Sequence, residues 1–180
     1  TGDVAVDPID GTTLTSKGLN GAVSVIALAP KGSMFDPKGA FYMNKIVTGA
    51  EAASVIDISA PAGENVRKVA KEKGVDVSDI TVIVLDRPRH SNLLEELRKA
   101  GARIRLIKDG DVAAAIETAR AGTGIDILMG IGGTPEGVIT AAAMRALGGV
   151  IQGQLMPQSE SEKESAKAAG HDLSKVYTTN

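Results

Sequence analysis

The chain has 180 residues, of which 43% are hydrophobic but only 2% are aromatic, so it can bury one sizeable core built from aliphatic side chains. The net charge of −2 disfavours bulk binding of nucleic acid or of an anionic membrane, although it leaves a local basic site open. With no cysteine and no long apolar run, the sequence predicts neither a disulfide framework nor a membrane-spanning segment, and a cytoplasmic protein is the simplest interpretation.

Residues 1–79 are predicted to form a β-rich part that contains one helix. Turn-rich segments separate three apolar runs, which predict strands over residues 3–7, 21–29 and 40–49. Residues 61–74 predict a short charged helix that turns Val66, Val69 and Ala70 toward the core. We expect this part of the chain to carry a metal and phosphate site.

Residues 80–157 repeat a strand and a helix three times. Short β-branched runs predict strands over residues 80–85, 103–107 and 125–130. Helices are expected over residues 92–100, 112–121 and 136–147, with N-caps at Ser91, Asp111 and Thr134 and terminal glycines at Gly101 and Gly148. Such a repeat requires a parallel sheet with right-handed crossovers. The sequence therefore predicts an α/β fold, followed over residues 158–180 by a polar connection and the start of a C-terminal segment.

Polar residues follow each of the three predicted parallel strands directly. The three loops that contain them are residues 86–90, 108–111 and 130–137. Ligands of open parallel sheets bind where such loops converge, outside the carboxyl ends of the strands. We therefore expect the three loops to form one site, which would bind a sugar.

The arginines and aspartates of these loops can each be interpreted in two ways. Pro88 stiffens the first loop and could hold Arg87 and Arg89 in directions that suit bidentate binding of phosphate. The same loop could equally be an exposed basic turn. Asp109 and Asp111 could accept hydrogen bonds from sugar hydroxyls, or they could belong to an ordinary turn that caps a helix.

The glycine-rich segment 130–133 does not predict a dinucleotide site, because it lacks the G-x-G-x-x-G spacing. Its glycines could instead let backbone N–H groups approach an anion at the start of the next helix. Glu136 lies in the first turn of that helix, where the helix dipole favours an acidic residue in any protein. A role for Glu136 in metal binding therefore needs independent support.

The segment DPIDGT near the start of the chain combines features of a metal site and of an acidic turn. Asp7 and Asp10 are three residues apart around a turn, so both carboxylates and the carbonyl of Ile9 can point at one hard cation such as Mg²⁺ or Mn²⁺. Gly11 and Thr12 offer a backbone N–H and a hydroxyl to a phosphate. Asp-Pro and Asp-Gly pairs are also ordinary turn formers, but the anion site expected elsewhere favours metal and phosphate binding.

In order and spacing, five segments of the chain resemble the class II fructose-1,6-bisphosphatases, members of the lithium-sensitive sugar and inositol phosphatase superfamily. The segments are VDPIDGTT, FYMNKIVTG, LDRPRH, GARIRLIKDGDVAAAI and MGIGGTPEGVITAAAMRALGGVIQGQL. The motif DPIDGT is shared with the wider superfamily, whereas RPRH, DGD and GIGGTPEG together are specific to class II enzymes. The resemblance extends from about Asp3 to Asn180.

The resemblance implies a layered α/β sugar-phosphatase fold with a mixed N-terminal sheet. It also implies Mn²⁺- or Mg²⁺-dependent hydrolysis of fructose 1,6-bisphosphate to fructose 6-phosphate and phosphate, a step of gluconeogenesis. Asp7, Asp10 and Glu136 would be metal ligands, Asp10 standing where some relatives carry glutamate. Asp10 and Thr12 would be catalytic, with Thr12 orienting and activating the attacking water. The residues implied to bind the substrate are Asp10, Gly11, Thr12, Tyr42, Arg87, Pro88, Arg89, Asp109, Gly110, Asp111 and Gly133.

We expect a homo-oligomer, a dimer or tetramer, that acts on a sugar bisphosphate and binds neither nucleic acid nor membrane. Sedoheptulose 1,7-bisphosphate or an inositol phosphate stays open as the substrate, and so does a non-catalytic sugar-phosphate-binding role. The chain begins inside a predicted strand, and the acidic ligands that the family carries upstream, like its closing strands, are absent from the sequence. We therefore expect a fragment that is inactive, or nearly so, by itself.

Overall fold

The computed structural model describes residues 2–180, which form an α/β fold with one large and one small sheet. The large sheet contains β3 (Tyr42–Thr48), β4 (Thr81–Leu85), β5 (Arg103–Ile107), β6 (Ile127–Gly133), β7 (Val150–Leu155) and β8 (Val176–Thr178). Their order across the sheet is β5–β4–β6–β3–β7–β8. As predicted, β4, β5 and β6 are parallel, whereas β3 is antiparallel to both of its neighbours, β6 and β7. The α/β class is confirmed.

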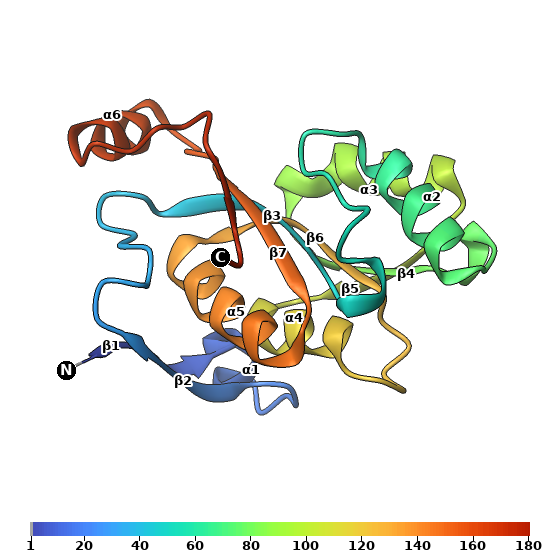
Figure 1. Ribbon diagram of the computed structural model, residues 1–180, viewed down its shortest axis with the longest axis horizontal. Coiled ribbons are helices and arrows are strands. Elements are labelled where there is room, and N and C mark those ends of the chain that lie inside the picture. Colours follow the sequence, from blue (N-terminus) through green and yellow to red (C-terminus); the bar gives the residue numbers. More distant parts are fainter. Residues whose placement is uncertain (1) are drawn as a thin grey trace.

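Helices cover both faces of the large sheet (Figure 1). α2 (Ala62–Lys73) and α3 (Ser91–Ala100) pack on one face, and α4 (Asp111–Ala119) and α5 (Thr134–Leu147) pack on the other. On the far side of α5 lies the small antiparallel sheet of β1 (Gly2–Asp10) and β2 (Val23–Pro30), so α5 is held between two sheets. The other helical segments are α1 (Thr12–Ser16), η1 (Ala50–Ala52), η2 (Val77–Asp79), η3 (Pro88–His90) and α6 (Glu160–Ala168). No helix within residues 2–180 combines the length and the hydropathy that crossing a bilayer requires.

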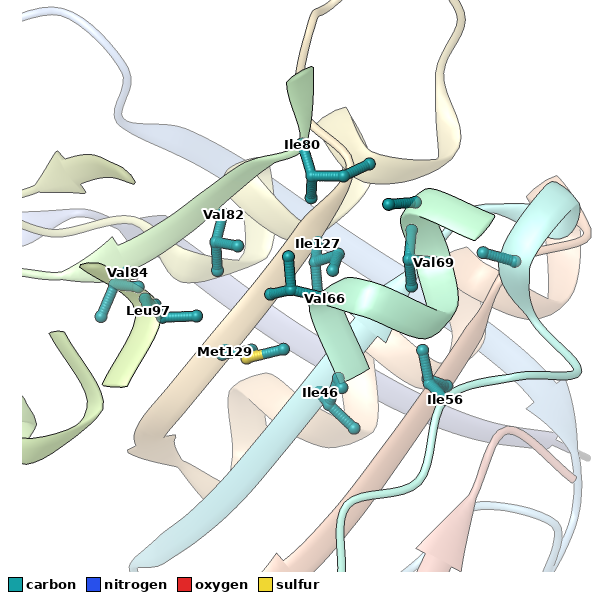
Figure 2. Close-up of a cluster of buried hydrophobic side chains, with 12 residues drawn as sticks. Ile46, Ile56, Val66, Val69, Ile80, Val82, Val84, Leu97, Ile127 and Met129 are labelled. Carbon is teal, nitrogen blue, oxygen red and sulfur yellow. The ribbon is translucent and has the colours of Figure 1, made fainter. Parts of the chain in front are cut away.

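Alternate residues of the central strands enter two separate cores. Ile46 of β3 faces α2 and α3, whereas the next residue, Val47, faces α4 and α5. Figure 2 shows Val66 and Val69 of α2 beside Ile127 of β6 in the first core. Val66 and Val69 are fully buried, which confirms the predicted inner face of this helix. Burial of each such side chain contributes roughly 1.5–3 kcal/mol to folding.

The helices begin close to where the sequence predicts, but the predicted N-caps Ser91, Asp111 and Thr134 are wrong. Each of them is the first residue inside its helix. The side chain of Asp111 finds a partner on β3 instead of on its own helix, which local sequence rules do not anticipate. The predicted terminal glycines are confirmed, because Gly101 and Gly148 have φ values of 88° and 77°, in the left-handed region.

β3 occupies a different place from the one that the sequence suggests. The apolar run over residues 40–49 is grouped with the N-terminal strands in the sequence interpretation, but β3 pairs with β6 and β7 in the middle of the large sheet. Partner choice of a strand depends on packing against distant residues, which an apolar run does not encode. β7 and β8 have no counterpart among the predicted strands. The division of the chain after residues 79 and 157 stays a prediction.

The small sheet carries large aliphatic side chains on its outer face. Val4 lies opposite Leu28 and Val6 lies opposite Ile26, and all four side chains are exposed. Half-buried alanines of the same two strands alternate with them and turn toward α5. The small sheet is therefore anchored through its inner face, and its end places the DPIDGT turn beside α4.

Candidate active site

The turn after β1 and the loops after β5 and β6 lie at one edge of the molecule. The N–H of Val112, at the start of α4, donates a hydrogen bond to the carboxylate of Asp10 at the end of β1, with an N–O distance of 3.1 Å. Tyr42, the first residue of β3, lies opposite Gly133, the last residue of β6. The structure therefore brings together segments that are far apart in the sequence, at the carboxyl ends of the parallel strands.

The two acidic turns at this edge, DPIDGT and DGD, are linked by reciprocal hydrogen bonds. Asp10 accepts a hydrogen bond from the first turn of α4, and Asp109 accepts one from the N–H of Thr13 in the first turn of α1 (3.0 Å). Each carboxylate thus caps the helix that follows the other turn, where free N–H groups and the helix dipole favour an anion. Gly110 has a φ of 85°, and a Cβ there would lie 3.4 Å from the carbonyl oxygen of Gly21. The DGD loop therefore packs beside Gly21, and the two hydrogen bonds link it to the DPIDGT turn.

A buried ion pair joins β3 to the start of α4. The ammonium of Lys45 lies 2.6 Å from Oδ2 of Asp111 and donates a second hydrogen bond to the carbonyl of Gly133 (3.1 Å). Lys45 is 3% exposed, and a buried ammonium requires such partners. Lys45 is not among the site residues that the sequence predicts. The sequence does contain a signal for it. Lys45 is two residues from both Met43 and Val47, so it shares the inward-facing side of a buried strand with these apolar residues.

The glycines of β6 make room for the chain's own side chains. A Cβ on Gly130 would lie 2.8 Å from Nε2 of His90, and a Cβ on Gly132 would lie 2.5 Å from Oδ2 of Asp111. Real Cβ atoms do not approach other atoms this closely, so both positions need glycine. The sequence suggests that an anion approaches the backbone at these glycines. In the structure, the close neighbours of these two glycines are instead an imidazole and an ion pair.

Two carboxylates at this edge are held in surroundings that disfavour their charge. Burial is the main cause that raises the pKa of Asp10 to about 6, and the negative charge of Asp111 adds to it. Burial also raises the pKa of Glu136, and the charges of Asp111 and Asp7 add to that increase while Lys45 opposes it. Among the side chains of residues 2–180, neither Asp10 nor Glu136 has an ion-pair partner.

The donor chemistry of this edge fits a hard divalent cation. Asp7, Asp10 and Glu136 supply the carboxylate oxygens that Mg²⁺ and Mn²⁺ prefer. Burial is the largest cause of the raised pKa values of Asp10 and Glu136, and a cation bound beside them would favour their charged forms. In the described part of the chain, however, no three acidic or histidine side chains lie close enough to form a complete metal cage. The residues present fit a partial coordination sphere.

The two arginines of the RPRH loop point to different partners. Nε and Nη2 of Arg89 donate to the carbonyl of Ile131 (3.1 and 2.8 Å), and the guanidinium lies over the ring of Tyr42, 5.3 Å from the ring centroid. Arg87 donates to the carbonyl of its neighbour Asp86 (2.9 Å). Arg89 therefore lies beside the end of β6, next to the Tyr42–Gly133 pair, whereas Arg87 stays at its own turn.

His90 ties two strands together and is not free to act as an acid or base. Its Nδ1 lies 2.7 Å from the carbonyl oxygen of Leu85, and the N–H of Ile131 donates to its Nε2 (2.7 Å). These bonds assign the proton to Nδ1. Burial lowers the pKa of His90, and the nearby charges of Arg89 and Arg87 lower it further, so the imidazole is neutral.

The remaining predicted residues lie around this edge. Gly11 has a φ of 95° and precedes α1, whose first residue, Thr12, is exposed. Asp7 is half-buried and accepts a hydrogen bond from the N–H of Ile9 in its own turn (3.1 Å). A cavity of about 460 Å³ is lined by Tyr42, Gly133 and Glu136 and, from α6, by Glu162, which the sequence analysis did not select.

Residues 1–180 match the family model of bacterial, glpX-encoded fructose-1,6-bisphosphatase. Relatives from Microcystis aeruginosa and Synechocystis sp. are each 49% identical over 158 residues, and one from Trichodesmium erythraeum is 51% identical over 154 residues. The three are named D-fructose 1,6-bisphosphatase class 2/sedoheptulose 1,7-bisphosphatase. The alignments cover 86–88% of this chain but only 44–46% of the relatives, so the chain spans about half the length of the curated relatives it matches. By the match along its whole length, the chain belongs to the glpX-encoded family of bacterial fructose-1,6-bisphosphatases.

Proposed function

We propose that the full-length protein containing this chain hydrolyses fructose 1,6-bisphosphate to fructose 6-phosphate and phosphate, with Mn²⁺ or Mg²⁺ as its cofactor. The names of the relatives support this reaction, and the family implies a divalent metal. The observation that carries the proposal is that an acidic group and a cationic group lie at the same edge of the molecule. Asp10 and Glu136 offer negative charge without an ion-pair partner in the described residues, and Arg89 with Tyr42 offers a cation beside the end of β6.

At the acidic end, Asp7, Asp10 and Glu136 would hold the divalent ion. The bound ion supplies positive charge that offsets the charge developing on the phosphoryl oxygens. Asp10 is mostly ionised at pH 7, because its pKa of about 6 lies below that pH. Thr12 directly follows the Asp10–Gly11 turn, and we assign its hydroxyl the task of orienting the attacking water.

At the cationic end, Arg89 and Tyr42 would bind the phosphate that is not cleaved. The two hydrogen bonds from Arg89 to the carbonyl of Ile131 fix the plane of the guanidinium before substrate arrives. A group fixed in advance loses little freedom on binding, so the far phosphate can position the near one for reaction. The loop of Asp109, Gly110 and Asp111 would lie along the sugar between them.

Sedoheptulose 1,7-bisphosphate is a second candidate substrate, because the relatives are named for both activities. A panel tests both: phosphate release by the full-length protein is measured with each bisphosphate and with an inositol monophosphate, in Mn²⁺ and after addition of EDTA. We expect turnover of fructose 1,6-bisphosphate that EDTA abolishes. Binding of the bisphosphate without Mn²⁺ and without turnover would indicate a non-catalytic sugar-phosphate-binding protein and overturn the proposal.

A further inference from the structure

Lys45 is a buried cation that lies beside the acidic residues of the candidate site. Its side chain is 2% exposed, and its ammonium is bonded to Oδ2 of Asp111 (2.6 Å) and to the carbonyl of Gly133 (3.1 Å). These two partners belong to different elements of the site, because Asp111 is the first residue of α4 and Gly133 is the last residue of β6. The sequence analysis assigns Lys45 no role, and neither the metal nor the substrate roles proposed above use it.

The surroundings of Lys45 hold it in one place. A Cβ on Gly132 would lie 3.0 Å from its Nζ, and a Cβ on Gly137 would lie 3.6 Å from its Cδ, so the absence of side chains at these glycines leaves space for the lysine. A Cβ on Gly137 would also lie 2.9 Å from the sulfur of Met43. An ammonium that is bonded twice and packed on several sides cannot leave Asp111 without opening the core.

The Lys45–Asp111 pair contributes to the electrostatic environment of the proposed metal ligands. The N–H of Val112, the residue after Asp111, donates to the carboxylate of Asp10 (3.1 Å), and the carbonyl that Lys45 binds belongs to Gly133, three residues before Glu136, so the pair lies beside the proposed metal ligands. A carboxylate bonded to an ammonium offers less negative charge to a second cation. Without Lys45, Asp111 would be one more carboxylate at this edge that has no ion-pair partner in the described residues.

We propose that Lys45 is a positioning residue that pairs with Asp111 and keeps this carboxylate out of the metal-ligand set, so that a divalent cation meets the charge of Asp7, Asp10 and Glu136 alone. This inference rests on the proposed function, because it requires a divalent cation to bind at this edge of the sheet.

The test measures the dissociation constant for Mn²⁺ by calorimetry, without substrate, on the full-length protein and four variants. Lys45→Met removes the cation, Asp111→Asn removes its partner, and the double variant removes both charges. Lys73→Met is the matched control, because Lys73 forms a similar pair with Asp126 (2.5 Å) at the opposite end of β6. Thermal unfolding of each variant is recorded in parallel.

We expect Lys45→Met to bind Mn²⁺ at least about tenfold more tightly, because one positive charge has been removed close to a divalent ion. Asp111→Asn should bind Mn²⁺ at least about tenfold more weakly, since Lys45 is then uncompensated. The double variant should return to within about threefold of the unaltered protein. Lys73→Met should lower the melting temperature without changing Mn²⁺ affinity, as a purely stabilising ion pair requires.

Affinities of Lys45→Met and Asp111→Asn that both stay within twofold of the unaltered protein would overturn the inference, and so would weaker binding by both. If Lys45→Met does not fold, Asp111→Asn is compared with the double variant, and equal affinities overturn the inference. If the unaltered protein binds no Mn²⁺, both the inference and the proposed metal site fail. If it binds Mn²⁺ with the expected pattern but does not hydrolyse fructose 1,6-bisphosphate, only the proposed reaction fails.

Discussion

Two lysine–aspartate pairs lie at opposite ends of β6, and they differ in what surrounds them. Lys73 of α2 pairs with Asp126, just before β6, at 2.5 Å. The other oxygen of Asp126 accepts a hydrogen bond from the N–H of Thr81 (2.8 Å), and its carbonyl accepts one from the hydroxyl of Thr48 (2.9 Å). This pair joins a helix and three strands. Lys73 also lies 3.6 Å from a carboxylate oxygen of Glu51, whose side chain is exposed to solvent.

At the other end of β6, the Lys45–Asp111 pair lies among further carboxylates. Asp10 and Glu136 have raised pKa values, and within the described part of the chain they have no cation of their own. An ion pair as such therefore does not distinguish a functional end from a structural one, because both ends have one. At the amino end the further carboxylate, Glu51, is exposed, whereas Asp10 is buried and Glu136 is half-buried, and this excess of negative charge away from solvent identifies the carboxyl end as a candidate site.

Removal of an excess carboxylate should have the largest effect. We expect Asp10→Asn to weaken Mn²⁺ binding by the full-length protein by more than about 100-fold, because groups that only support metal ligands already account for 10–100-fold. The metal-free variant should be at least as stable as the unaltered protein, since a buried charge near Asp111 has been removed. Calorimetry with Mn²⁺ and thermal unfolding in EDTA check the two parts. Unchanged Mn²⁺ affinity would show that Asp10 is not a ligand.

Replacement of the cation beside the end of β6 should act on substrate binding. Arg89→Ala should raise KM for fructose 1,6-bisphosphate about 10- to 100-fold, in line with the loss of a hydrogen bond to a charged group. KM for a sugar monophosphate should change much less, and Arg89→Lys should retain part of the affinity because it keeps the charge. Steady-state kinetics on both substrates decide, and equal losses for the two substrates count against recognition of the far phosphate.

Disruption of the Lys73–Asp126 pair, at the amino end of β6, should lower the stability of the protein and leave its catalytic activity unchanged. Lys73→Met leaves Asp126 without its ammonium, and we expect a loss of about 1–3 kcal/mol in the free energy of unfolding. The kcat and KM of the full-length protein should stay unchanged, because the pair is at the far end of β6 from the site. Urea unfolding and steady-state kinetics measure the two quantities. A fall in kcat without a loss of stability would contradict the comparison.

The smallest expected effect is a pH dependence that belongs to Asp10. Its pKa is about 6 in the folded protein, above the ordinary value of 3.8, so the folded state holds this proton more tightly than the unfolded state does. Asp10 therefore destabilises the metal-free protein above pH 6, and this cost disappears as the pH falls from about 6 toward 4. The difference in melting temperature between Asp10→Asn and the unaltered protein should shrink over this window. A difference that is constant from pH 7.5 to pH 4.5 would show that Asp10 has an ordinary pKa.

Much of the fold could be predicted because its signals are local. The β-branched runs of β4, β5 and β6 and the terminal glycines Gly101 and Gly148 report short-range preferences that the structure keeps. β3 could not be placed, since its partners β6 and β7 lie more than 75 residues further along the chain. The predicted N-cap Asp111 is wrong for a similar reason, because Asp111 bonds to Lys45 and Asp10 from β1 caps α4 in its place.

The candidate site was predictable as a set of loops but not as a set of contacts. The rule that loops meet at the carboxyl ends of parallel strands led to Arg89, Asp109 and Glu136 without any coordinates. The ion pair of Lys45 lies outside that rule, because it comes from the interior of an antiparallel strand. The different directions of Arg87 and Arg89 depend on which backbone carbonyl lies nearby, and this is a property of the folded chain.

The central proposal is that the uncompensated carboxylates at the carboxyl end of β6 bind a divalent cation. The most direct measurement is the change in melting temperature of the full-length protein on addition of Mn²⁺ at pH 7.5, for the unaltered protein, Lys73→Met and Asp10→Asn. We predict a clear increase for the first two, because a ligand that binds the folded state stabilises it, and almost none for Asp10→Asn. An equal increase in all three would contradict the account.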